Sequence, residues 1–195
     1  MKKKRIDPVK YPDTVRAPQG MTRYATIFSG LMLVATHASA ADILKVGSPA
    51  PVITAQDQAN KPWNLADTLS RPTVNAVLLY FYPKDNTPGC TKQACGYRDH
   101  ISTFIQKGVE VVGVSCDSVT SHQRFAKKFK LTFTLLADAK CKASDAYGVR
   151  VPKRNFTRRV SFLISKEGKI LHVVANRDPL RHISEMQMAI NKHLQ

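Results

Sequence analysis

The chain has 195 residues, of which 43% are hydrophobic and 8% aromatic, a composition typical of a globular protein that can bury a core. Thirty Lys and Arg against fourteen Asp and Glu give a formal net charge of +16, which suggests a nucleic-acid or anionic-membrane surface. The charge is spread along the chain, however, and its denser runs at 127–130 and 153–159 come without a helix-turn-helix, zinc-finger or aromatic RNA-binding motif, so we expect a basic solvated surface and no specific nucleic-acid partner.

The N-terminal residues have the pattern of an export signal. After Met21, a basic residue precedes an apolar stretch at 25–35, and Ala38, Ser39 and Ala40 form a small-residue cleavage site. The apolar stretch is too short for a membrane-spanning helix, which needs about twenty residues, so we expect no membrane anchor after processing. We predict an upstream extension at 1–20, a signal peptide at 21–40 and an exported, for example periplasmic, protein. An organelle transit peptide is the alternative, because the segment is basic and poor in acidic residues.

Residues 41–195 have the size of one domain, and no linker, repeat or low-complexity tract divides them. Residue types and turn signals predict strands, and apolar residues at helical spacing predict helices. The expected strands are at 52–55, 62–65, 74–82, 109–116, 133–136, 160–165 and 169–174, and the expected helices at about 91–106, 119–129, 143–147 and 180–194. This order predicts an α/β sheet that is parallel in its first part and antiparallel at one edge.

The four cysteines, at positions 90, 95, 116 and 141, leave several states open. An even number in an exported protein allows a disulfide framework, although an α/β domain of this size does not need one. A zinc site lacks a second close Cys or His pair, and we expect neither a metal nor a cofactor. Cys116 ends a predicted strand and Cys141 precedes a predicted helix, so we expect buried or partly buried free thiols there, with a mutual disulfide as the minor alternative.

Cys90 lies where a turn rich in Pro, Asp, Asn and Gly meets the start of a predicted helix. Only a thiolate is nucleophilic, and a helix N-terminus favours it through a positive field and free backbone N–H groups. The hydroxyl of Thr87 can accept a hydrogen bond from the helix and donate one to a substrate oxygen. Pro83 and Pro88 stiffen the turn and can shield the sulfur from water. We therefore predict a reactive thiol at Cys90.

The stretch FYPKDNTPGCT resembles the peroxiredoxins of the alkyl hydroperoxide reductase/thiol-specific antioxidant family, and most closely the bacterioferritin-comigratory or Q-type subgroup. The family signature of Pro, three residues, Thr, two residues and Cys is present as Pro83, Thr87 and Cys90. The resemblance covers essentially all of 41–195. It implies a thioredoxin fold with a central mixed sheet flanked by helices and with peroxiredoxin-type N-terminal strands. It also maps the active-site arginine to Arg159 and the resolving cysteine of atypical 2-Cys members to Cys95.

Two neighbours of these residues bear on the match. Gln93 stands where many relatives have Glu, so a carboxylate that could orient the arginine is replaced by an amide. Arg158 precedes Arg159, and strand alternation would point it the other way.

The resemblance implies reduction of hydrogen peroxide and organic hydroperoxides in antioxidant defence and redox homeostasis. Cys90 would become a sulfenic acid, Cys95 would convert it to a disulfide, and a thioredoxin-like dithiol would reduce that disulfide, in a monomer. A thiol:disulfide oxidoreductase of the same fold is an alternative, but its C-x-x-C pair is absent. A basic nucleic-acid-binding module with a structural disulfide is the other, and it predicts retention by DNA at low salt without peroxide consumption.

The cleavage pattern yields a test of export. We expect the mature chain to begin at Ala41, because the small-residue site ends at Ala40. N-terminal sequencing of secreted material measures this directly. Functional protein that retains Met1 or Met21 would contradict the export prediction.

Overall fold

The computed structural model describes residues 42–194; the predicted extension at 1–20 and signal peptide at 21–40 lie outside the described residues. The strands are β1 (Thr54–Asp57), β2 (Pro62–Asn64), β3 (Ala76–Phe81), β4 (Val109–Ser115), β5 (Thr134–Ala137), β6 (Val160–Ser165) and β7 (Ile170–Ala175). The helices are α1 (Leu65–Ser70), α2 (Pro88–Asp99), α3 (Ile101–Gln106), α4 (Val119–Phe129), α5 (Lys142–Ala146) and α6 (Pro179–His193).

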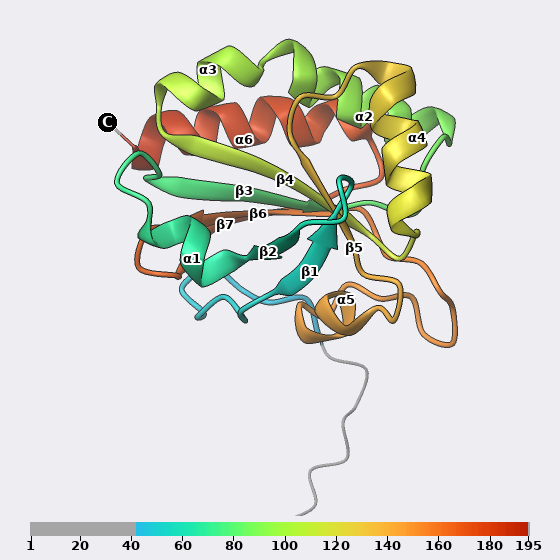
Figure 1. Cartoon of the computed structure of the whole chain (residues 1–195). Coiled ribbons are helices and arrows are strands. Elements are labelled where there is room, and N and C mark those ends of the chain that lie inside the picture. The colour runs from blue at the N-terminus through green and yellow to red at the C-terminus, as the bar shows by residue number, and fades with distance from the viewer. Residues whose placement is uncertain (1–41, 195) are drawn as a thin grey trace, which may run out of the picture. The chain divides into compact units, whose positions relative to one another are not determined.

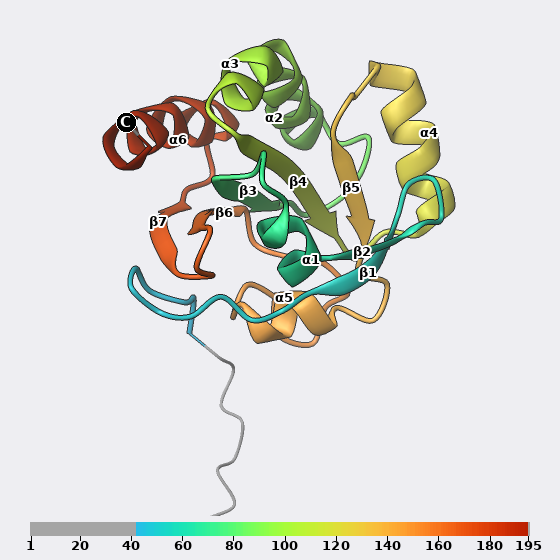
Figure 2. The ribbon, with the colours of Figure 1, turned by 60° about the vertical axis from the view of Figure 1, so that its left-hand side comes forward.

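The seven strands form one sheet in the order β2-β1-β5-β4-β3-β6-β7, with helices α2, α3, α4 and α6 on one face and α1 and α5 on the other (Figures 1 and 2). Strands β3, β4 and β5 are parallel, and all other neighbours in the sheet are antiparallel. The predicted mixed sheet flanked by helices is confirmed. The prediction of antiparallel pairing at one edge was incomplete, because the β1–β2 hairpin adds to β5 at the other edge.

Strand β3 lies at the centre of the core, and all six of its residues are buried. Its side chains alternate between two hydrophobic clusters, so that Tyr80 belongs to the cluster under α2 and α6 and Phe81 to the cluster on the opposite face. A strand that is covered on both faces needs apolar residues at every position. This explains the unbroken apolar run in the sequence, and it makes β3 a rigid support for the loop that follows it.

Three helices differ from the sequence-based expectation. Helix α1 was not predicted, although Asn64 caps it by accepting from the N–H groups of Ala66 and Asp67. The predicted helix at 91–106 is two helices, α2 and α3, which are interrupted at His100. Helix α2 also begins at Pro88, before the predicted start, because proline is well suited to the first turn of a helix.

The expectation of free thiols at Cys116 and Cys141 was wrong, because the two residues form a disulfide with a Cα–Cα distance of 5.4 Å. Cys116 follows β4, and Cys141 comes shortly after β5. These adjacent strands run parallel, so their carboxyl ends meet at one edge of the sheet and bring the two cysteines together. A cross-link between residues 25 positions apart restricts the unfolded chain and is worth about 3.5 kcal/mol by loop-closure entropy.

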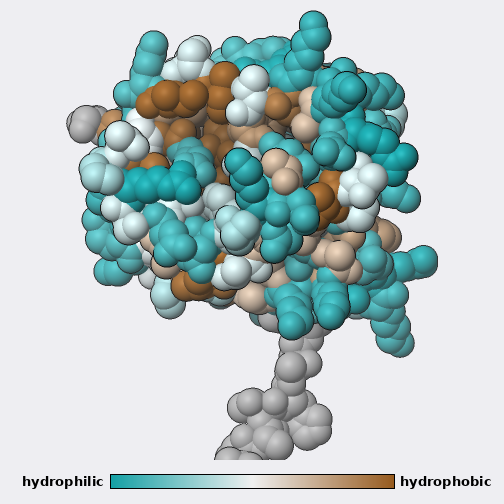
Figure 3. Space-filling model, viewed as in Figure 1, coloured by the Kyte–Doolittle hydropathy of each residue, from teal (hydrophilic) through white to brown (hydrophobic). Residues whose placement is uncertain are grey.

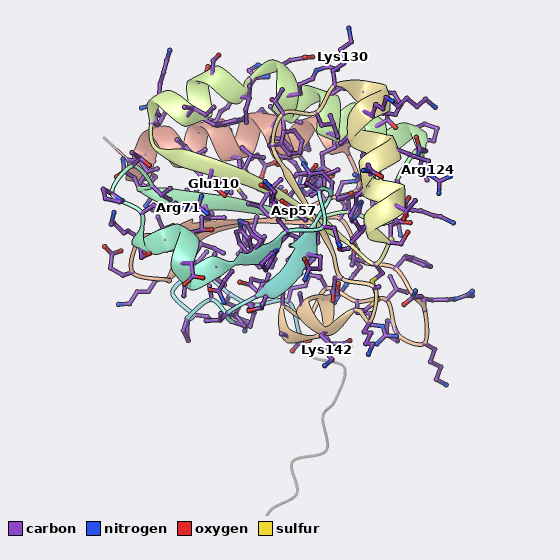
Figure 4. All side chains as sticks on the ribbon, in the orientation of Figure 1. Asp57, Arg71, Glu110, Arg124, Lys130 and Lys142 are labelled. Atoms are coloured by element: carbon purple, nitrogen blue, oxygen red, sulfur yellow. A yellow bond between two sulfur atoms is a disulfide. The ribbon has the colours of Figure 1, made fainter. Side chains whose placement is uncertain are left out.

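The surface is polar over most of the face in Figure 3, with apolar side chains gathered around α3 and the start of β4. Basic side chains point outward from separate parts of the fold, as Arg124, Lys130 and Lys142 do in Figure 4. Between residues 42 and 194, no helix has the length and apolar character that crossing a membrane requires. The same part of the chain contains no group of three or more His, Cys, Asp or Glu side chains placed to hold a metal ion.

A buried Asp–His pair fixes the loop between β3 and α2. The Asp85 carboxylate lies 2.9 Å from His122 Nδ1 and accepts from Ser121 Oγ at 2.7 Å and from the Tyr82 hydroxyl at 2.8 Å. His122 Nε2 faces the Leu136 carbonyl at 3.1 Å. Both ring nitrogens of His122 are thus engaged, Nδ1 by the Asp85 carboxylate and Nε2 by the Leu136 carbonyl, and the pair joins the loop to α4.

The backbone of the same loop is held from β4. The N–H of Asp85 donates to Asp117 Oδ2 at 2.9 Å, and Ser115 Oγ donates to the same oxygen at 2.7 Å. The loop that leads into α2 is therefore tied to α4 and to the end of β4 before any substrate arrives.

The Asp85–His122 pair predicts a pH-dependent stability. Burial by itself would raise the pKa of Asp85, but the hydrogen bond and charge of His122, with the Ser121 and Tyr82 hydroxyls, hold it below its ordinary value. A lowered folded-state pKa contributes stability above the unfolded pKa of about 3.9, and this contribution disappears as the pH falls through the folded value. We expect Asp85→Asn to lower the free energy of unfolding by about 3 kcal/mol at pH 7, with a smaller difference near pH 3.

Urea unfolding at the two pH values measures this difference. The exposed Asp67 provides a control, and Asp67→Asn should change the stability by less than about 0.5 kcal/mol. A difference for Asp85→Asn that stays constant from pH 7 to pH 3 would contradict the role of the ionised Asp85 carboxylate.

Candidate active site

The topology of the sheet brings the start of α2 and the start of β6 together. Strands β3 and β6 are antiparallel neighbours in which Phe81 pairs with Val160. The loop that leaves the end of β3 and enters α2 therefore passes the residue just before β6, which is Arg159. Residues separated by about 70 positions in the sequence meet at this corner of the sheet.

Cys90 is in the first turn of α2, and its side chain is 1% exposed. It is a free thiol, and Arg159 Nη2 lies 3.5 Å from its sulfur. Backbone N–H groups in the first turn of a helix have no partner within the helix, and the helix dipole is positive there. The guanidinium and the helix terminus thus place positive charge beside a buried sulfur, the surroundings that favour a reactive thiol.

Arg159 is held in place from α2. Gln93, which is fully buried, accepts from Arg159 Nη1 at 2.5 Å through its side-chain oxygen. The amide thus supplies the acceptor that a Glu would supply, without its charge. A side chain at Gly89 would have its Cβ 3.1 Å from Arg159 Nη2, so glycine at this position gives the guanidinium room.

The two neighbouring arginines point in different directions, as strand alternation predicted. Arg158 donates to the carbonyl of Gly148 and lies outside the Cys90 site.

Thr87 and Pro83 lie in the loop that approaches Cys90. Thr87 is the N-cap residue of α2, but its hydroxyl donates to the Lys84 carbonyl at 3.0 Å and makes no capping hydrogen bond. The expectation that this hydroxyl accepts from the helix was therefore wrong, because the hydroxyl is turned back toward the Lys84 carbonyl. Pro83 lines a hollow beside Arg159, as described below.

Cys95 lies on the same helix as Cys90, and both thiols are free. Its side chain is half-buried, and the structure does not join it to Cys90. Arg98 follows one turn later. The pKa of Arg98 is raised, mainly by its hydrogen bond to Asp99 and in smaller part by Cys95, which places a cation near this thiol.

An apolar hollow of about 570 Å³ opens next to Arg159. Its lining is mostly apolar, with arginines at its edge and no acidic residue: Ile43, Pro83, Val151, Phe156, Thr157, Arg158, Arg159, Val160, Ala175, Asn176 and Arg177. The hollow gives the Cys90 site an apolar neighbourhood of the size of a small organic molecule.

Sequence reasoning did not find the polar side chains beneath the site. Ser161 and His182 are fully buried, and Tyr97 of α2 lies 3.1 Å from Ser161 through its hydroxyl. A signal for Ser161 was available, since it is two residues after Arg159 and alternation places both on one face of β6. His182 carried no such signal, because its position on α6 relative to β6 depends on the tertiary fold.

Known proteins share this sequence and fold. Residues 46–173 match the model of the AhpC/TSA family. A Coxiella burnetii protein named as a bcp peroxiredoxin is 41% identical over 149 residues, which cover 73% of this chain and 96% of that protein. The chloroplastic peroxiredoxin Q of Sedum lineare is 43% identical over 143 residues, which cover 71% of this chain and 74% of the plant protein.

Solved structures agree with the sequence matches. The peroxidoxin BcpB of Mycobacterium tuberculosis superposes with a TM-score of 0.73 at 29% identity, and the match covers 78% of this chain and 99% of that one. A cysteine-to-serine mutant of Xylella fastidiosa PrxQ gives a TM-score of 0.71 at 25% identity, over 80% of this chain and all of the other. With the mixed sheet and the Cys90 corner described above, these matches show that the chain belongs to the AhpC/TSA family and is a thioredoxin-fold peroxiredoxin of the bcp/Q type, a thiol peroxidase.

Proposed function

We propose that this peroxiredoxin reduces hydrogen peroxide and organic hydroperoxides with Cys90 as the nucleophile and Cys95 as the resolving thiol. The observation that carries the proposal is the position of Arg159, whose guanidinium lies 3.5 Å from a buried free thiol at the start of a helix. A cation and unpaired N–H groups around a sheltered sulfur favour a thiolate and can also stabilise the negative charge of a breaking O–O bond.

In the first step, the Cys90 thiolate attacks the terminal oxygen of the peroxide. The S–O bond forms as the O–O bond breaks, and water or an alcohol leaves with a proton, so that Cys90 becomes a sulfenic acid. Arg159 and the N–H groups near Gly89 and Cys90 stabilise the charge that moves to the leaving oxygen. Thr87 contributes by turning its hydroxyl from the Lys84 carbonyl toward the substrate.

In the second step, the Cys95 thiol attacks the Cys90 sulfur, a disulfide forms and water leaves. An external dithiol of the thioredoxin type then reduces the disulfide by exchange and returns both thiols. All of these side chains come from one chain, which supports a catalytic monomer.

The hollow beside Arg159 supports organic hydroperoxides as substrates. Its apolar lining, which includes Ile43, Val151 and Phe156, can hold a hydrocarbon group, while Arg159 and Pro83 at one side lead to the reacting thiol. Hydrogen peroxide needs no such surface.

The resolving step requires a change in α2. Cys90 and Cys95 lie in one helix, where five residues give a rise of about 7.5 Å and a rotation of about 140°, and thus a Cα–Cα distance of roughly 8.6 Å. A disulfide requires less than about 7 Å. We propose that α2 unwinds from Cys90 to about Arg98 in each catalytic cycle.

Gly96 lies within the segment that is proposed to unwind. Its missing side chain lets α6 pack closely, since a Cβ would meet Ile183 Cδ1 at 2.8 Å. A glycine in a helix is also less favourable than alanine by about 1 kcal/mol, which lowers the free energy of opening.

We also propose that the protein is exported with its signal peptide removed. The signal pattern at 21–40 motivates this proposal, and the Cys116–Cys141 disulfide supports it, because such bonds persist mainly in oxidising compartments.

Variants of the site residues test the assignment of roles. Cys90→Ser should abolish peroxide reduction, because it removes the nucleophile. Arg159→Ala and Thr87→Val should retain a slower reaction, with kcat/KM lower by on the order of a hundredfold for Arg159→Ala, because each supplies stabilisation to the same thiolate. With hydrogen peroxide as the substrate, Arg158→Ala is a matched control that should change the rate little, since this arginine points away from Cys90 and the small substrate does not need the hollow that Arg158 lines.

Intact mass after one equivalent of hydrogen peroxide reports the resolving step. The wild-type chain with both site thiols reduced should lose two hydrogens, about 2 Da, at Cys90 and Cys95. Cys95→Ser should consume one peroxide and stop. Full steady-state turnover of Cys95→Ser with a thioredoxin-type reductant would remove Cys95 from the mechanism.

Hydrogen exchange tests the unwinding of α2. Amides from Thr91 to Arg98 should be protected in the reduced protein and exchange faster in the disulfide form, because the helical hydrogen bonds are lost. Strand β3 provides the internal reference, since it stays buried in both forms. Equal protection of the α2 amides in the reduced and disulfide forms, with the disulfide confirmed by mass, would contradict this proposal.

A further inference from the structure

A chain of buried hydrogen bonds joins the catalytic helix to β6 and α6. The Tyr97 hydroxyl lies 3.1 Å from Ser161 Oγ, Ser161 Oγ lies 2.8 Å from His182 Nδ1, and His182 Nε2 lies 2.9 Å from the carbonyl of Asn176. The side chains of Tyr97, Ser161 and His182 are all 0% exposed. The proposed chemistry does not use this chain of hydrogen bonds, although it begins two turns after Cys90 on the same helix.

The proton positions in this chain follow from its end. The Asn176 carbonyl only accepts, so His182 Nε2 carries a proton and donates to it. Burial lowers the pKa of His182, which favours the neutral ring, and Nδ1 is then an acceptor. Ser161 must donate to Nδ1, and its oxygen accepts from Tyr97. Every donor in this series of hydrogen bonds therefore points from α2 toward α6, and each hydroxyl proton takes part in a hydrogen bond.

The same face of α2 carries the active-site contacts. Cys90, Gln93 and Tyr97 follow at intervals of three and four residues, which places them in a row along one side of the helix. Arg159, just before β6, and Ser161, on β6, are two residues apart and share a face. Cys90 and Gln93 contact Arg159, and Tyr97 contacts Ser161. The part of the row that contacts Arg159 belongs to the catalytic site. The part that contacts Ser161, and through it His182, has no role in the proposed chemistry.

We propose that the Tyr97–Ser161–His182 chain is a latch that holds α2 folded and sets the rate at which Cys95 reaches Cys90, an inference that rests on the proposed unwinding of this helix. In the folded helix the buried Tyr97 hydroxyl is bonded to Ser161 Oγ. In the unwound helix water replaces Ser161. The hydrogen bond therefore favours the folded form, and its loss shifts the equilibrium toward the open form.

The latch acts on the second step and not on the first. The peroxide reacts with Cys90 in the folded site, where Arg159 and the helix N-terminus surround the sulfur. The sulfenic acid can then follow two routes. If α2 opens, Cys95 forms the disulfide with Cys90. If α2 stays folded, a second peroxide can oxidise Cys90 to the sulfinic acid; the O–O bond of this peroxide breaks, and water or an alcohol leaves. A tighter latch favours the second route.

Tyr97→Phe tests the latch, because it removes one hydroxyl and keeps the packed ring. After one equivalent of hydrogen peroxide, acid quenching and intact mass give the rate of disulfide formation, which should rise by about fivefold, the effect of one hydrogen bond. The rate at which Cys90 is oxidised should not change when measured in a Cys95→Ser background. With excess peroxide, the fraction of chains that carry a sulfinic acid should fall.

Tyr147→Phe is the matched control. Tyr147 is equally buried and also donates one hydrogen bond, to the Pro51 carbonyl at 2.8 Å, but it does not lie on α2. It should lower the global stability by a similar amount and leave the rate of disulfide formation unchanged. An equal acceleration in both variants would show a general loss of stability and overturn the latch, as would an unchanged or slower rate in Tyr97→Phe.

Ser161→Ala provides a second test of the latch. It leaves the Tyr97 hydroxyl without a partner in the folded helix, so disulfide formation should again be faster, and an unchanged rate in this variant also counts against the latch. Failure of the underlying mechanism looks different, since the wild-type protein would then form no Cys90–Cys95 disulfide at all.

Discussion

The antiparallel pairing of β3 with β6 is the contact on which the active site depends. It places the end of the most deeply buried strand beside the residue that precedes β6, and so sets Arg159 against the first turn of α2. Neither partner could fix this geometry alone, since Cys90 lies after a turn and Arg159 lies after a long irregular segment. The rest of the fold supports the pairing: the helices cover both faces of β3, and the Asp85–His122 pair holds the loop from the other side.

Helix α2 has to meet two opposing demands. The first chemical step needs a rigid helix terminus around the sulfur, with Gln93 and Arg159 in fixed positions. In the mechanism that we propose, the second step needs the same helix to open, because its regular geometry keeps the two thiols apart. Hydrogen bonds hold α2 in the folded form, but each has only a modest net free energy, because water can replace it when the helix opens. The apolar packing of β3 is not needed for this change and stays intact.

Much of this could be predicted from sequence, and the remainder has a common physical cause. Local patterns indicated the strands, because buried strands need unbroken apolar runs, and alternation separated Arg159 from Arg158. The break at His100 was missed because apolar residues continue at helical spacing through it. The Cys116–Cys141 bond, the Asp85–His122 pair and the role of His182 all join elements distant in sequence. Residue type alone does not say which of several histidines or cysteines will meet a partner, since this is decided by how the parallel strands and the helices pack.

The protein contains two kinds of sulfur site, the Cys116–Cys141 disulfide and the free thiols of α2. Exchange requires an attacking thiolate to approach a disulfide sulfur, and Cys141 is 0% exposed while Cys116 is 7% exposed. Cys95 is half-buried and lies on the helix that we propose to open. The buried Cys116–Cys141 bond is therefore kept apart from the thiols of Cys90 and Cys95 within one polypeptide. Burial therefore limits the access of a reductant to the Cys116–Cys141 bond.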